Sequence, residues 1–476
     1  MEKKKFSMPT AYTILIGLIV VVALLTWIVP AGQYETTEID GDQVPISGTY
    51  EQIERTPQNL FDVIKAPATG FQDAVDVALF ILIVGGFLGV VMKTGAIDAG
   101  ISRVTHILKG REKIMIPILM VLFGIGGTTY GMAEETIAFY PLLIPIFVAA
   151  GYDTVTAVAV IMLGAGAGVL ASTVNPFATG IASGFADVSL GQGILLRIVM
   201  LVIIETAAIL YVIRYAERVR KDPTKSLTYS TREEDRKFFL SSKGTDGNDF
   251  PELTGRGKII LVLFAITFLV MIYGVIPFAD MGITFLPTLN WWFTELGSLF
   301  LIMAIIIGIV GGLGEKDLVG SFVDGAMDLL GVAFIVGISR GITVVMNAGN
   351  ITATILNLGE KTLASTGNIA FTLLTYLFYI PMSFLIPSTS GLATLSMPIM
   401  APLGDFAGVT RDVVITAYQS ASGLVNLITP TSAVVMGGIA IGRISYDKWV
   451  KFVLKFLAII FVISIISLIV GALGIL

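Results

Sequence analysis

Uninterrupted apolar segments, each about as long as a membrane's hydrocarbon core is thick, dominate this sequence. The plainest charge-free runs are 11–29, 259–276 and 456–476. About twenty apolar residues in a helix span a bilayer. Only 14% of the 476 residues are charged, whereas soluble domains carry roughly 25%. These features exclude an ordinary soluble enzyme and predict an all-α polytopic membrane protein.

The residue types that are absent exclude several kinds of chemistry. The chain has no cysteine, which rules out disulfides and thiolate metal sites. It has no HExxH or Walker sequence, and we expect no enzyme, no resident metal and no resident cofactor. The formal charge of -5 comes without a basic and aromatic patch, so no nucleic-acid partner is expected. The expected partners are a small-molecule substrate and the lipid bilayer.

The distribution of charge over the loops predicts the orientation of the chain. Lysines at 3–5 precede the first apolar run and place the N-terminus in the cytoplasm by the positive-inside rule. The acidic loop 32–60 is then outside, and the basic loop 103–113 is inside. The polar segment 215–257, which is rich in Lys and Arg, is predicted to be a mobile cytoplasmic linker.

The two halves that flank this linker resemble each other when one is shifted by 254 to 257 positions. Matches in the same order include PLLIP at 141–145 with PIMAP at 398–402, and Pro176 with Pro430. We therefore predict an N-terminal repeat in 1–214, and an extra helix followed by a second repeat in 258–476. Loop charge gives the two repeats opposite orientations. Inverted repeats with interrupted helices are typical of alternating-access transporters.

Each repeat is predicted to contain a re-entrant helical hairpin followed by a proline-broken helix. The hairpins are 114–150, on the cytoplasmic side, and 371–408, on the outside. The broken helices are 152–189 and 411–442. Proline frees backbone carbonyls, and such backbone at membrane depth is tolerated only where it is buried or lines a watery cavity.

The two hairpin tips and two helix breaks carry hydroxyl and amide side chains that could bind a polar substrate or a dehydrated sodium ion. Hydrogen bonding between membrane helices is the competing interpretation for any single Ser or Thr. The candidate residues are Thr128, Thr129, Tyr130, Ser172, Thr173, Asn175, Ser388, Thr389, Ser390, Asn426, Thr429, Thr431 and Ser432.

Charged residues inside the apolar part are the most informative. Glu134 and Glu135 follow the first hairpin tip and have no acidic counterpart in the second hairpin. Because a carboxylate at the membrane centre is costly, we expect the pair to recognise a cationic group or to bind a proton or sodium; helix capping is the structural alternative. Arg340 could hold a substrate carboxylate or neutralise a glutamate. Arg197 and Glu205, in one predicted helix, are expected to pair with other helices.

Five motifs, found along nearly the whole chain, resemble the YfcC-type basic amino acid antiporter branch of the dicarboxylate anaerobic carrier superfamily. They are WIVPAGQY at 27–34, GMAEET at 131–136, TVNPF at 173–177, PSTSG at 387–391 and NLITPT at 426–431. The resemblance implies a bacterial-type plasma (inner) membrane carrier that moves by an elevator motion, usually as a homodimer. It also implies exchange of arginine and ornithine.

The acidic hairpin favours a cationic amino acid, with Glu134 or Glu135 facing its guanidinium or ammonium group and Arg340 near its carboxylate. The alternative is a carboxylate symporter, in which Arg340 holds an anionic substrate. A coupled sodium ion or proton would then bind at Glu134, Glu135, Asn175 or Asn426. An intramembrane enzyme or sensor is the remaining class.

Overall fold

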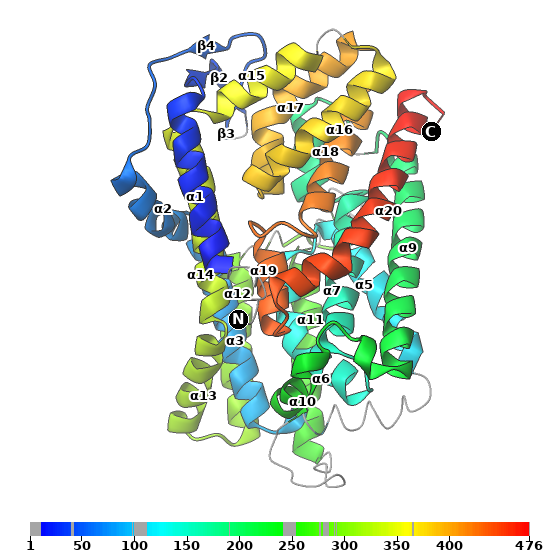
Figure 1. The fold of residues 1–476 in the computed structure, drawn as a ribbon. Coiled ribbons are helices and arrows are strands. Elements are labelled where there is room, and N and C mark those ends of the chain that lie inside the picture. Colours follow the sequence, from blue (N-terminus) through cyan, green and yellow to red (C-terminus); the bar gives the residue numbers. More distant parts are fainter. Residues whose placement is uncertain are drawn as a thin grey trace, which may run out of the picture.

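The computed structural model describes residues 11–39, 42–97, 99, 112–189, 191–240, 254–275, 278, 285–289, 291, 293–363 and 366–475. Helices make up most of this part, as the apolar runs predict (Figure 1). The lysines at 3–5 and most of the basic loop 103–113, which predict the orientation, lie outside the described residues.

The first half begins with α1 (Ala11–Ile28) and four short strands, which depart from the all-α expectation. Strand β1 (Gly32–Gln33) pairs with β4 (Glu51–Gln52), and β2 (Thr36–Ile39) pairs with β3 (Asp42–Pro45), both antiparallel. The helices that follow are α2 (Leu60–Asp73), α3 (Val75–Lys93), α5 (Met115–Tyr130), η2 (Glu134–Phe139), α6 (Tyr140–Ala149), α7 (Thr154–Leu170), η3 (Pro176–Gly180), α8 (Ile181–Phe185) and α9 (Ile194–Lys221).

The segment expected to be a mobile linker is folded through Leu240. Helix α9 continues to Lys221, and η4 (Pro223–Lys225), η5 (Tyr229–Thr231) and α10 (Arg232–Leu240) follow. Helix α10 packs against α6. Arg443 holds it in place, with its guanidinium 3.5 Å from the Asp235 carboxylate and 4.5 Å from the ring centroid of Phe238. The composition of 215–257, from which mobility is predicted, does not reveal these contacts.

The second half contains α11 (Gly255–Val275), α12 (Phe293–Gly311), α13 (Glu315–Asp328), α14 (Leu330–Ala348), α15 (Thr352–Leu363), α16 (Asn368–Leu385), α17 (Thr389–Phe406), α18 (Arg411–Val425), α19 (Ala433–Ile441) and α20 (Tyr446–Ala472). Six helices of the described part, α3, α9, α12, α14, α16 and α20, are long and apolar enough to cross a membrane. Helices α15 to α17 lie at one end of the molecule, and α6, α10 and α13 lie at the other (Figure 1).

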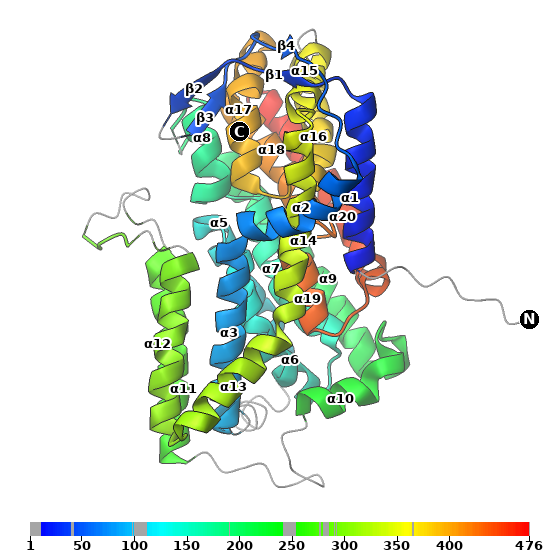
Figure 2. The same cartoon turned by 90° about the vertical axis from the view of Figure 1, so that its left-hand side faces the viewer.

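Several helices of the two halves have similar lengths in the same order. Helices α2 and α13 each have 14 residues, α3 and α14 each have 19, and α9 and α20 have 28 and 27. Helices of one half pack on helices of the other half. In the first half α1 and α2 both pack on α14, and in the second half α12 and α13 both pack on α3. We call this arrangement exchanged packing. Helices α7 and α18, and also α9 and α20, pack on each other. Figure 2 shows α3 beside α12 and α13.

Glycines allow the exchanged pairs to approach closely. A Cβ on Gly70 of α2 would lie 2.4 Å from the carbonyl oxygen of Gly337 in α14. A Cβ on Gly325 of α13 would lie 2.3 Å from the carbonyl oxygen of Gly85 in α3. The two glycines are 255 positions apart and lie in helices of equal length, so a similar close crossing occurs twice.

We expect Gly325→Ala to lower the free energy of unfolding by about 1–3 kcal/mol, because the added methyl overpacks a backbone contact. Gly320→Ala is the matched control on the same helix, since a Cβ at Gly320 meets no atom within 4 Å. Alanine is also the better helix former. The thermal unfolding midpoints of the purified variants measure the difference, and equal midpoints would contradict the close crossing.

Candidate functional site

The first predicted hairpin is interrupted where α5 ends. Gly131 terminates α5 with φ of 75°, in the left-handed region that suits glycine, and the short helix η2 begins at Glu134. Glu135 is buried, and its Oε2 accepts a hydrogen bond of 3.0 Å from the amide of Ala133. Glu135 therefore fills the capping role considered for one acid of the pair.

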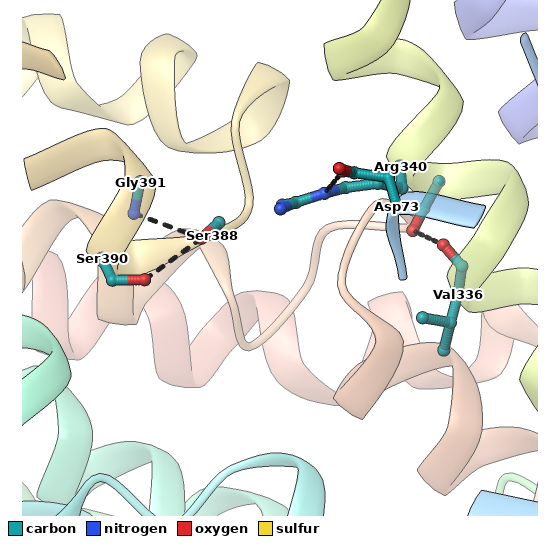
Figure 3. Close-up of polar contacts among 7 residues, drawn as sticks. Asp73, Val336, Arg340, Ser388, Ser390 and Gly391 are labelled. Carbon is teal, nitrogen blue, oxygen red and sulfur yellow. Dashed lines mark hydrogen bonds and ion pairs between the residues drawn. The ribbon is translucent and has the colours of Figure 1, made fainter. Parts of the chain in front are cut away.

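The second predicted hairpin is interrupted between α16 and α17. Ser388 caps α17, and its Oγ accepts a hydrogen bond of 3.2 Å from the amide of Gly391 (Figure 3). Its Oγ also lies 3.4 Å from the Oγ of Ser390. The hydroxyl of Tyr418, from α18, donates to the carbonyl of Thr389. The tip is thus held by its own serines and by the neighbouring broken helix.

The broken helix of the first half is interrupted between α7 and η3. The Oδ1 of Asn175 accepts hydrogen bonds from the amides of Phe177, at 2.9 Å, and Ala178, at 3.2 Å. The same oxygen packs against Gly131, where a Cβ would lie 2.5 Å from it. Asn175 therefore caps the helix after the break and also contacts the first tip.

The broken helix of the second half is interrupted between α18 and α19. The Nδ2 of Asn426 donates to Ser422 Oγ at 3.4 Å, while its Oδ1 is buried and has no hydrogen-bond partner in the described structure. The hydroxyls of Thr429 and Thr431 lie 2.7 Å apart, and Thr431 donates to the carbonyl of Phe384 at 2.9 Å. Ser432 caps α19.

All four interruptions border one cavity of about 350 Å³. Ten residues singled out from the sequence line it: Glu134, Glu135, Asn175, Arg340, Ser388, Thr389, Ser390, Asn426, Thr431 and Ser432. Residues that are more than 200 positions apart therefore meet at one place.

Five other candidates do not line this cavity: Thr128, Thr129, Ser172, Thr173 and Thr429. All of these except Thr129 have hydroxyls that bond at or beside the breaks. Thr128 Oγ1 donates to the Thr173 hydroxyl at 3.1 Å, and the Thr173 amide donates to Thr128 Oγ1 at 3.0 Å. Thr129 donates to the carbonyl of Ile125, one turn earlier. Tyr130 is the last residue of α5, and its side chain lies outside the described part.

Arg340, from α14, faces the second tip and pairs with an acid that sequence reasoning missed. Its Nε donates to the carboxylate of Asp73, from the end of α2, and the side chain extends toward Ser388 (Figure 3). Arg340 also interacts electrostatically with Glu134. Asp76, at the start of α3, lines the cavity as well. Acids at helix ends are ordinary features of a sequence, so nothing in the sequence marked Asp73 or Asp76.

The charges on the described lining do not balance. Four carboxylates, those of Asp73, Asp76, Glu134 and Glu135, face a single guanidinium, that of Arg340. Charge interactions are stronger in a partly enclosed cavity than in bulk water. The cavity is therefore suited to a ligand that carries more positive than negative charge and includes one anionic group.

Comparison with protein families gives a match over nearly the whole sequence. The model of the DcuC family, described as C4-dicarboxylate anaerobic carrier, matches residues 8–473. An uncharacterized protein of Haemophilus influenzae is 35% identical, with 98% of both chains covered. A protein of Escherichia coli, provisionally named basic amino acid antiporter YfcC, is 30% identical, with 97% of this chain and 96% of that protein covered.

Solved structures show only a distant likeness. The YdaH transporter of Alcanivorax borkumensis has a TM-score of 0.44 and 12% identity, with 98% of this chain and 99% of that chain covered. MtrF of Neisseria gonorrhoeae, described with a class of antimetabolite efflux pumps, has a TM-score of 0.43 and 16% identity, with 97% and 95% covered.

We expect Gly131→Ala to lower the free energy of unfolding by more than Gly151→Ala. Both glycines have positive φ, so each alanine adds backbone strain of roughly 1–2 kcal/mol. Only the Cβ at position 131 meets Asn175, whereas a Cβ at Gly151 meets nothing within 4 Å. The unfolding midpoints of the two variants measure the contribution of the contact. Equal losses would show that the contact with Asn175 does not stabilise the tip.

Proposed function

This chain belongs to the C4-dicarboxylate anaerobic carrier family, and we propose that it is a secondary transporter that exchanges basic amino acids of the arginine and ornithine type. The excess of carboxylates in the cavity carries this proposal. Arginine and ornithine each have two cationic groups and one carboxylate at neutral pH, which complements four acids and one guanidinium. The name of the Escherichia coli relative supports the same substrate class.

The proposed binding mode gives each wall of the cavity one end of the substrate. Glu134 and Glu135 take the side-chain guanidinium or ammonium group, since bidentate pairing with a carboxylate is the strongest contact open to a guanidinium. Arg340, held by Asp73, takes the substrate carboxylate together with the hydroxyls of the second tip. The buried Oδ1 of Asn426, which has no partner in the described structure, accepts from the substrate α-amino group.

We further propose that the two halves are inverted repeats that move by an elevator mechanism in a homodimer, in a plasma membrane, with the N-terminus in the cytoplasm. The exchanged packing of α2, α3, α13 and α14 supports the inversion. Lys93 Nζ lies 3.8 Å from the Asp317 carboxylate, so α3 ends where α13 begins. Helix α14 then leads away from that end, antiparallel to α3 (Figure 2).

One specific observation favours a second candidate, a sodium- or proton-coupled carboxylate symporter. Arg340 is the one cationic side chain of the described lining, and it could hold an anionic substrate while the acids bind the coupling ion. The family description, C4-dicarboxylate anaerobic carrier, agrees with that substrate. The two candidates differ in what they transport, so one assay separates them.

Liposomes that contain the purified protein and unlabelled arginine should take up labelled arginine. External ornithine should compete, and an imposed sodium or pH gradient should not be required. Empty liposomes are the control for leak. Absence of arginine exchange together with sodium- or proton-driven uptake of a dicarboxylate would overturn the first candidate in favour of the second.

Glu134→Gln and Glu135→Gln should each raise the half-saturating arginine concentration roughly tenfold or more. The loss of a charge-assisted hydrogen bond costs about 1.5–3 kcal/mol. Asp317→Asn is the control, because Asp317 is exposed and lies outside the cavity. Unchanged exchange in both glutamine variants would remove the special role assigned to this pair.

Arg340→Gln should reduce the preference for arginine over agmatine, which is arginine without its carboxylate. Competition of the two compounds against labelled arginine measures this preference. In the original protein arginine should compete better, because only arginine can pair with Arg340. A preference that survives in Arg340→Gln would place the substrate carboxylate elsewhere.

A further inference from the structure

Glu205 is a buried acid that the proposed substrate site does not use. It lies within α9, a helix long and apolar enough to cross a membrane. Its side chain is 8% exposed, and in the described structure neither carboxylate oxygen has a hydrogen-bond partner. The sequence-based expectation that Glu205 pairs with another helix is therefore not met in the described part of the chain. A buried polar group without a partner requires an explanation.

The elements that pack against α9 offer Glu205 no counter-charge. These elements are α5, α7, α20 and, beyond its last turn, η4. Helices α5 and α7 contain no Asp, Glu, Lys, Arg or His. The charged residues of α20 are Asp447, Lys448, Lys451 and Lys455, all within its first ten residues. The rings of Phe452 and Phe456 pack on Tyr211, which places this part of α20 nearer the C-terminal end of α9 than Glu205 is.

The charged residues of α9 itself and of η4 are also remote. Arg197 and Arg214 are eight and nine positions from Glu205, about 12–14 Å along the helix axis. Asp222 and Lys225 lie beyond the end of α9 and pair with each other, with 3.5 Å between their charged atoms. Tyr211 donates its hydroxyl to the carbonyl of Phe452. Among the described side chains of these elements, no charged or titratable group faces the Glu205 carboxylate.

A glycine on α5 makes room for this carboxyl group. A Cβ added to Gly124 would lie 2.8 Å from Glu205 Oε2, so the carboxyl group lies directly against the α5 backbone. Gly168 of α7 also lies close to this part of α5, because a Cβ added to Gly168 would be 2.1 Å from the Gly124 carbonyl oxygen. The same helix α5 ends seven positions later at Gly131, the tip that leads to Glu134. Glu205 therefore contacts the helix that positions the proposed substrate site.

An ionised carboxylate in these surroundings would lack water, a cation and hydrogen-bond donors, whereas the neutral acid is tolerated. We propose that Glu205 is a proton-binding site, which holds a proton while α5 packs against α9 and releases it to water only when this contact opens. The group then cycles between a carboxylic acid and a carboxylate plus one free proton. The link to substrate movement rests on the proposed transport function; the proton site itself does not.

Infrared difference spectroscopy of the full chain in liposomes tests the proton site without a transport assay. A protonated, buried carboxyl group gives a carbonyl stretching band that a carboxylate lacks. We expect such a band at neutral pH and its loss in Glu205→Gln, whose amide mimics the neutral acid. Glu217→Gln, on the same helix but in an exposed ion pair with Lys113, should leave the band unchanged. A spectrum that Glu205→Gln leaves unaltered would overturn the proton site.

The pH profile of arginine exchange tests the link to transport. We expect the exchange rate of the original protein and of Glu217→Gln to vary with pH, and that of Glu205→Gln to lose this variation. A pH profile in Glu205→Gln that matches the original would overturn the link. If none of the proteins exchanges arginine, the proposed function fails, and the infrared band still decides whether Glu205 holds a proton.

Discussion

A helix that is interrupted inside an apolar protein leaves backbone amides and carbonyls without their helical partners, and this constraint governs the centre of the molecule. Such groups cannot be left unpaired away from water. Side chains supply many of the partners: Gln419 donates to the carbonyl of Ser172, Trp449 to that of Leu427, Tyr446 to that of Ile428, and Thr431 to that of Phe384. Side chains of neighbouring helices therefore hold the interruptions in place.

Mutual support between the interruptions explains why they share one cavity. The carbonyl of Thr128, at the end of α5, accepts hydrogen bonds from the amides of Thr173 and Val174, in the break of the adjacent helix. Tyr418 connects the other broken helix to the second tip. Each tip is thus tied to a break in its own half, and the contact of α7 with α18 brings the two halves together.

The sequence was informative wherever physics restricts the choice of residue. Proline and glycine located the interruptions, because few other residues tolerate or cause them, and the intramembrane charges Glu134 and Arg340 marked the cavity. The sequence was uninformative where the role of a residue depends on its neighbours in the folded structure. Thr128 and Thr173 resemble ligands in the sequence but bond to each other. Asp73 resembles an ordinary helix end until α14 brings Arg340 beside it.

The folded segment after α9 shows the same limit. Its mixture of charges and small residues predicts mobility, yet Asp153 at the start of α7 accepts hydrogen bonds from Tyr215 and Ser226, at 2.6 and 2.7 Å. Hydrogen bonds from a distant segment to one buried carboxylate produce no periodic pattern in the sequence, so the sequence does not predict them.

The ion pair between Arg340 and Asp73 has a consequence for any ligand that carries a carboxylate. Such a ligand shares the guanidinium with Asp73, whose carboxylate accepts a hydrogen bond from Nε. Its binding free energy at this contact is smaller than that of a pair with a lone guanidinium, because the Asp73 carboxylate already neutralises part of the positive charge. A carrier gains from this arrangement, since a cargo that is held only moderately at its anionic end can leave as readily as it arrives.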